Sequence, residues 1–170
     1  MTHLRRAFAQ TIALLAIAST TVWAQDELRV EKPDGSRRHF TVAEFVAMST
    51  DTVRVAMHHA PLATYSVISL RRVLAESGVP VDSLRGRQLA LVVVGEARDG
   101  YRVAFSLGEL APAMGAREVL LAFRRDGVDL PAAEGPFRLI VQGEQRQSRA
   151  IRQLARLRIV DLADERVPAR

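Results

Sequence analysis

The sequence predicts an α+β fold, with mixed β-structure and short helices between the strands. Three observations predict it. Short segments alternate apolar and polar residues with the period of two that is typical of strands. Asp-Gly pairs at Asp99-Gly100 and Asp126-Gly127 mark tight chain reversals. Serine or threonine with helix-capping spacing precedes several short apolar stretches.

The first expected elements are a hairpin and a helix. Leu28 and Val30 alternate with charged residues, and a Pro-Asp-Gly turn leads into residues 37–40, which predicts a short β-hairpin. Thr41 is followed three residues later by glutamate, so a helix of about two turns should begin there. Its expected apolar face consists of Val42, Phe45 and Val46.

A strand and a second helix come next. Alternation over residues 53–57 predicts a strand that runs into His58-His59. Ser69 is expected to cap a helix, which Gly78 and the following proline end. The buried side of this helix is expected to carry Leu70, Val73 and Leu74.

The middle of the chain predicts two paired strands. Residues 89–94 are continuously apolar, which is typical of a central strand covered on both faces. Asp99-Gly100 then reverses the chain into a partner strand at 101–105. Ser106 has capping-box spacing to a glutamate, and Pro112 limits the helix there to about one turn.

The last expected elements are strands. Residues 119–123 form one, with a hairpin signal at Asp126-Gly127, and residues 137–141 form another. Leu157 and Ile159 alternate with arginines in a final strand. Together the strands are expected to share one core containing Leu91, Val93, Phe105, Leu121, Leu139 and Ile159.

Residues 1–24 have the features of a secretory signal peptide. Arg5 and Arg6 precede an apolar run that is too short to span a bilayer, and Val22-Trp23-Ala24 fits a signal-peptidase site. The mature protein is therefore expected to begin near Gln25, to be periplasmic or secreted, and to have no membrane span. The arginine pair leaves twin-arginine export open beside the general secretory route. Residues 25–170 are expected to form a single domain.

Composition excludes several classes of site. The chain has no cysteine, which rules out disulfides, thiolate metal ligands and c-type haem attachment. The formal net charge is +5, from 24 basic and 19 acidic residues, without a basic stripe interleaved with aromatics. A nucleic-acid partner is therefore not expected.

His58-His59 is the most conspicuous pair of candidate catalytic residues. Adjacent side chains on a strand point to opposite faces, so the two rings cannot chelate one metal without a bend. A zinc site needs three or four protein ligands, and His39 is the one other histidine outside the expected signal peptide. No metal site is predicted. One packed and one solvent-facing histidine is the simpler interpretation.

Arginines gather near the end of the chain. Their guanidinium groups suit bidentate contacts with phosphate or carboxylate, whereas a charged run of this kind is also typical of a solvated face. Both interpretations stay open. The arginines are Arg146, Arg149, Arg152, Arg156 and Arg158.

An ordered set of segments between Leu70 and Leu162 resembles the oxidoreductase molybdopterin-binding domain family, which has the sulfite-oxidase-type fold. The chain is similar in particular to short secreted stand-alone versions of that domain. The segments that carry the resemblance are 70–78, Asp99-Gly100-Tyr101 with Ser106-Leu107, 119–122, Asp126-Gly127 with Leu130-Pro131, 135–143 and 149–160.

The resemblance implies a pterin cofactor and a set of site residues. Tyr101 matches the stretch that carries the family's active-site tyrosine, and molybdopterin is a possible cofactor. The family's molybdenum-ligating cysteine falls in the region 53–60, which here offers Met57, His58 and His59. Molybdenum held in the family's usual way is therefore not expected. The expected cofactor-binding residues are Arg138, Arg146 and Arg149.

Three functions follow from the resemblance. The first is a secreted molybdopterin-binding-domain-like protein that binds a pterin, another small anion or a protein partner, without standard molybdenum catalysis. The second is a molybdopterin-dependent oxidoreductase with a non-cysteine metal ligand. The third is an interaction subunit of an envelope redox complex. The expected partners are accordingly a small anionic ligand or an envelope redox protein.

A count of charges predicts where an anion would bind. Glu134 and Glu144 are too few to satisfy all the arginines near them in sequence. Two or more of these arginines are therefore expected to converge near residues 55–58 and to form a positive pocket. The arginines are Arg138, Arg146, Arg149 and Arg152.

Overall fold

A computed structural model describes residues 27–48, 51–57 and 60–164 of the protein. The predicted signal peptide and the His58-His59 pair lie outside the described residues. In the described part, strands dominate and the helices between them are short. The predicted α+β class with mixed β-structure is confirmed.

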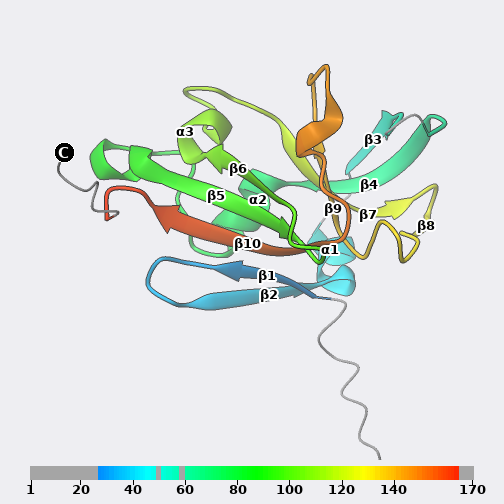
Figure 1. The fold of residues 1–170 in the computed structure, drawn as a ribbon, viewed down its shortest axis with the longest axis horizontal. Coiled ribbons are helices and arrows are strands. Elements are labelled where there is room, and N and C mark those ends of the chain that lie inside the picture. Colours follow the sequence, from blue (N-terminus) through cyan, green and yellow to red (C-terminus); the bar gives the residue numbers. More distant parts are fainter. Residues whose placement is uncertain (1–26, 49–50, 58–59, 165–170) are drawn as a thin grey trace, which may run out of the picture.

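The first sheet, called sheet A below, has five strands in the order β2-β1-β10-β5-β6 (Figure 1). β1 and β10 run parallel, and the other neighbours are antiparallel. Both predicted hairpins of this sheet, β1–β2 and β5–β6, are confirmed, as is the final strand. The bounds are β1 Glu27–Glu31, β2 Arg37–Thr41, β5 Leu91–Ala97, β6 Arg102–Ser106 and β10 Leu154–Asp161.

The second sheet, sheet B, is entirely antiparallel, in the order β3-β4-β7-β8, with β9 paired to β7. The strands predicted at 53–57, 119–123 and 137–141 correspond to β3, β7 and β9. Strand β4 was not predicted from the sequence. The bounds are β3 Asp51–Val55, β4 Ala63–Ser69, β7 Val119–Arg125, β8 Val128–Asp129 and β9 Arg138–Val141.

Helix α1 (Val42–Met48) begins at its predicted capping box. The Glu44 N–H donates to the Thr41 hydroxyl (3.2 Å), and the Glu44 carboxylate accepts from the Thr41 N–H (2.8 Å). Phe45 is fully buried, whereas Val46 is exposed. The prediction that Val46 belongs to the buried face is therefore wrong: the short helix turns it toward solvent.

Helices α2 (Leu70–Glu76) and α3 (Leu107–Leu110) also begin at predicted caps. The hydroxyl of Ser69 accepts from the Arg72 N–H (3.2 Å), and that of Ser106 accepts from the Glu109 N–H (2.9 Å). Gly78 follows α2 with φ +74°, the left-handed conformation that ends many helices. Within the described ranges, no helix has the length and apolar character needed to cross a bilayer.

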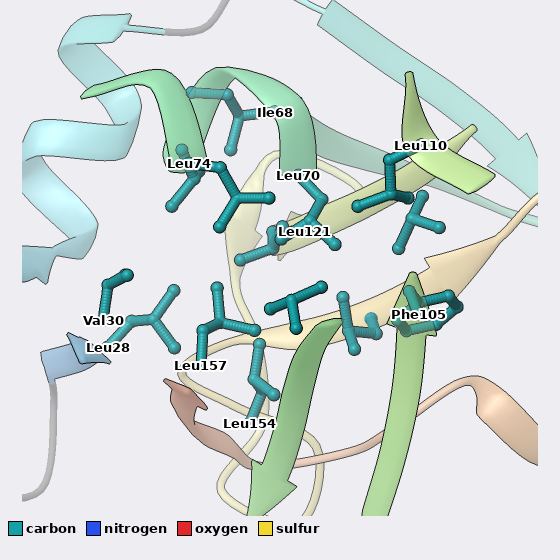
Figure 2. Packing of buried hydrophobic residues seen from close by; sticks show 14 of the residues in the cluster. Leu28, Val30, Ile68, Leu70, Leu74, Phe105, Leu110, Leu121, Leu154 and Leu157 are labelled. Carbon is teal, nitrogen blue, oxygen red and sulfur yellow. The ribbon is translucent and has the colours of Figure 1, made fainter. Parts of the chain in front are cut away.

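The main core lies between the two sheets and α2 (Figure 2). Leu28 and Leu157 of sheet A, Leu121 of sheet B and Leu70 of α2 all point into it. The predicted set of core residues is confirmed, with Leu91 only partly buried at the edge of the cluster.

Strand β5 differs from its prediction. Val93, Gly95 and Ala97 are buried, while Val92 and Val94 on the other face remain half-buried. The expectation of a strand covered on both faces is therefore wrong, because one face of sheet A is open. Residues 89–90 belong to a 3-10 helix, η2 (Gly86–Ala90), and not to the strand.

Candidate functional site

Tyr101 lies in a loop that is fastened to a distant part of the chain. Gly100 has φ +86°, which glycine adopts without strain, and the Tyr101 N–H donates to Asp99 Oδ1 (2.9 Å). The Tyr101 hydroxyl donates to the Ser148 carbonyl (2.8 Å). The turn before β6 is thereby joined to the 3-10 helix η3 (Gln147–Arg149).

A cleft of about 560 Å³ lies where these two segments meet. This volume is within the range of small-molecule sites. Tyr101 contributes an aromatic ring that is half exposed, Asp99 a carboxylate and Arg152 a guanidinium. The lining residues are Ala97, Asp99, Tyr101, Ala133, Gln147, Ser148, Ala150, Ile151, Arg152 and Gln153.

Gln153 lines the cleft in a strained backbone conformation. Its φ is +50°, which non-glycine residues adopt rarely. The strain is held by hydrogen bonds: the Gln153 N–H donates to the Glu134 carbonyl (2.8 Å), the Gln153 carbonyl accepts from the Arg98 N–H (3.0 Å), and its side chain donates to the Ala132 carbonyl (2.6 Å). Backbone strain of this kind clusters at binding sites, where the surroundings fix one geometry.

Arg152 is the arginine that the cleft offers to a ligand. Its side chain is exposed and lines the cleft, and within the described residues no carboxylate forms an ion pair with it. Arg138, Arg146 and Arg149 do not line this cleft. Of the four arginines considered from the sequence, Arg152 alone therefore combines a place in this cleft with an uncompensated charge.

Arg138, an expected cofactor-binding residue, is buried in sheet B. Its side chain is 2% exposed, and its Nη1 donates to the Glu134 carboxylate (2.5 Å). The guanidinium lies over the ring of Tyr65, while its Nε and Nη2 are buried without hydrogen-bond partners. Glu134 also binds Arg125 (2.7 Å), and Tyr65 and Glu134 together raise the pKa of Arg125. Arg138 is thus part of a buried polar cluster, out of contact with solvent.

Arg149, the second expected cofactor-binding residue, is held by two carboxylates. Its Nε donates to Glu144 (2.7 Å), and its Nη2 donates to Glu109 (3.1 Å) and to Glu144. The guanidinium also lies 4.6 Å from the ring centre of Phe105. Burial opposes the charge of Arg149, but Glu109 and Glu144 outweigh it and raise its pKa. Its positive charge is therefore compensated within the protein.

Arg146, the third expected cofactor-binding residue, precedes η3 and is exposed, with no ion pair among the described residues. Arg138 and Arg149 do not share a carboxylate, since each binds its own.

The charge count from the sequence missed Glu109, because its position suggested only a helix cap. Its carboxylate instead crosses to a segment 40 residues away. The cation left for a ligand in the 560 Å³ cleft is Arg152.

The segment before the histidine pair lies beside η3. The Gln147 side chain donates to the Ala56 carbonyl (2.7 Å), and Met57 is buried in a second apolar cluster that also contains Tyr65. A smaller cleft of about 230 Å³ lies on this side, and Gln147 and Ala150 line both clefts. The candidates His58 and His59 themselves are outside the described residues.

The donor set does not provide a recognisable metal centre in the part of the chain that the structure describes. There, no three histidine, aspartate or glutamate side chains come together as metal ligands. The complete sequence contains no cysteine, so no thiolate is present to bind a metal. The lining of the 560 Å³ cleft offers hydrogen bonding, aromatic contact and charge pairing to a ligand.

No family model matches the chain, and no curated protein is significantly similar to it.

Proposed function

We propose that the protein is an exported binding domain with a sulfite-oxidase-type molybdopterin-binding fold, whose cleft takes a small anionic heterocycle without molybdenum redox chemistry. The observation that carries this proposal is the 560 Å³ cleft that brings Tyr101, Asp99 and the uncompensated Arg152 together. The mixed α+β structure of the described residues is compatible with this fold.

The lining groups suit a pterin-like ring with an anionic substituent. The exposed face of Tyr101 offers a surface for stacking a flat ring. The Asp99 carboxylate is an acceptor suited to the N–H groups of an aminopyrimidinone edge. The Arg152 guanidinium can form a charge-assisted, bidentate contact with a carboxylate or phosphate. These three residues would hold the ring and its charge from different sides.

Molybdenum bound as in the resembling family does not fit the residues of this chain. The family uses one cysteine thiolate as a ligand, and the corresponding region offers Met57, whose side chain is buried in an apolar cluster. A thioether is a soft, neutral ligand and a poor substitute for a thiolate at a high-valent metal. The proposed function therefore uses no metal-centred step.

Titration calorimetry with pterin-6-carboxylate tests the proposal. The unmodified protein is expected to bind this compound, and Arg152→Gln is expected to weaken binding by about 10- to 100-fold, because a charged hydrogen bond contributes about 1.5–3 kcal/mol. Arg146→Gln removes an equal charge from an exposed position outside the cleft and should change the affinity less than about twofold. Unsubstituted pterin should bind more weakly and should not distinguish Arg152→Gln from the unmodified protein.

Two results would contradict the proposal. One is the absence of measurable binding of either pterin to the folded protein. The other is an equal loss of affinity in Arg152→Gln and Arg146→Gln, which would reflect overall charge instead of a cleft.

A further inference from the structure

The outer face of sheet A, called the open face below, has no covering layer among the described residues. Along each strand, buried residues such as Leu28, Leu157 and Phe105 alternate with residues that point away from the core. None of these outward residues is buried. Pairing registers place on the open face Thr41, His39 and Arg37 of β2, Glu27, Arg29 and Glu31 of β1, Arg156, Arg158 and Val160 of β10, Val92, Val94 and Glu96 of β5, and Arg102, Ala104 and Ser106 of β6.

Two arginines are direct neighbours on this face. A cross-strand row runs from His39 through Arg29, Arg156 and Glu96 to Arg102. Arg29 and Arg156 occupy paired positions on the parallel strands β1 and β10, where like charges repel each other. The Nε of Arg29 is shielded from solvent and has no hydrogen-bond partner. The row therefore sets two positive charges side by side and leaves one shielded donor without a partner.

The next cross-strand row contains one carboxylate, that of Glu31, which lies near several arginines. Glu31 lies 3.5 Å from Arg37, 3.7 Å from Arg29 and 3.9 Å from Arg156. These distances exceed those of good hydrogen bonds, so the carboxylate is shared without a close partner. Arg158, which pairs in register with Glu31, is exposed and forms no ion pair with any described residue. Three guanidinium groups thus share a single acid, and a fourth, that of Arg158, has none.

An apolar patch adjoins these arginines. Val92 and Val94 of β5 and Val160 of β10 are half-buried side chains of the open face, and Ala104 of β6 is exposed beside them. Val160 pairs with Val92, and Val94 pairs with both Arg158 and Ala104. The open face therefore combines a cationic region with a contiguous aliphatic one, and no helix of the described chain hides either.

We infer that the open face is a docking surface for a partner protein that presents an acidic segment interspersed with aliphatic side chains. Its carboxylates would lie among Arg29, Arg156 and Arg158, and its aliphatic groups would cover the valines of β5 and β10. Arginine-rich surfaces give both charge complementarity and bidentate contacts at such interfaces. None of the open-face residues lines the Tyr101 cleft.

The composition of the open face favours a protein over other occupants. The aliphatic side chains of Val92, Val94 and Val160 beside the arginines match apolar groups of a protein partner, which a phosphate backbone does not present. The face also has no phenylalanine, tyrosine or tryptophan on which nucleic-acid bases would stack. Two copies of the face would bring like charges together.

The test is fluorescence anisotropy with a labelled peptide of alternating glutamate and valine. About ten residues are enough to cross five strands spaced about 4.8 Å apart. Arg156→Gln/Arg158→Gln is expected to weaken binding about tenfold, since two ion pairs are lost. The matched control, Arg54→Gln/Arg72→Gln, removes two exposed arginines from β3 and α2 and should have less than about a twofold effect. Melting curves confirm that each variant is folded.

Charge reversal gives a second, independent readout. The Arg156→Glu/Arg158→Glu variant should no longer bind the glutamate–valine peptide. It should instead bind a lysine–valine peptide, which the unmodified protein does not bind. The inference is overturned if the acidic peptide does not bind, or if both double variants lose the same affinity. Stronger binding to phosphatidylglycerol vesicles or to single-stranded DNA than to the peptide also overturns it. The inference is also overturned if the unmodified protein forms a dimer and the Arg156→Gln/Arg158→Gln variant is a monomer.

Discussion

Replacing Glu134 with alanine is expected to lower the free energy of unfolding by about 3–5 kcal/mol, because it leaves the charge of Arg138 buried and uncompensated. Arg138 is 2% exposed, and Glu134 is the one carboxylate that it binds among the described residues. Two of its nitrogens already lack partners, so no nearby acceptor can take over. Urea denaturation of the variant and of the unmodified protein measures the difference.

The other half of the pair is expected to behave differently. Arg138→Met removes the buried charge together with its two unpartnered nitrogens, and Glu134 keeps its bond to Arg125. Arg138→Met should therefore lower the free energy of unfolding by less than about 2 kcal/mol. Glu118→Ala, at an exposed position, is the control and should change stability by less than about 0.5 kcal/mol. A larger loss of unfolding free energy in Arg138→Met than in Glu134→Ala would contradict this, because it would mean that Arg138 does not depend on Glu134 for its compensation.

Replacing Leu121 with alanine is expected to cost about 2–5 kcal/mol through lost transfer energy and a residual cavity. Leu121 is fully buried at the centre of β7, where it faces the core between the two sheets. Val128→Ala on β8 removes apolar volume from an exposed position and should change stability by less than about 0.5 kcal/mol. A change of only a few tenths for Leu121→Ala in the same denaturation experiment would mean that the core is assembled differently.

Local signals predicted the helices well. Each begins where a hydroxyl and an N–H three residues later can form a cap, and this depends on a few adjacent residues only. Strand β4 was not predictable in this way. Its register shifts between Ser66 and Val67, so the buried residues Tyr65, Val67 and Ile68 do not alternate regularly. A bulge removes the period of two on which a strand is recognised.

The two faces of β5 show a second limit. A continuous apolar run predicts burial on both sides, but burial depends on whether another layer covers the outer face. In the described structure that layer is absent, so Val92 and Val94 stay half-buried. The sequence of the strand carries no information about elements far away in the chain.

The candidate site was predictable in part. Tyr101, a candidate from the family resemblance, lines the cleft, whereas the expected cofactor-binding residues Arg138, Arg146 and Arg149 do not. Arg152, which does line it, was considered only as one of a group of neighbouring arginines. The ion-pair partners of the other arginines could not be predicted, because these pairs depend on long-range packing. Glu109 reaches Arg149 only after α3 and η3 have come together. Gln153 gave no sequence signal, since its left-handed backbone conformation is imposed by hydrogen bonds to distant carbonyl and amide groups.

The proposed binding of an anionic heterocycle in the Tyr101 cleft requires no molybdenum. Elemental analysis of the protein purified in native form from its own cells tests it most directly, because any cofactor loaded in the cell is retained. We expect molybdenum far below one atom per chain in protein that still binds pterin-6-carboxylate through Arg152. One molybdenum atom per chain would contradict it and would show that a non-cysteine ligand holds the metal.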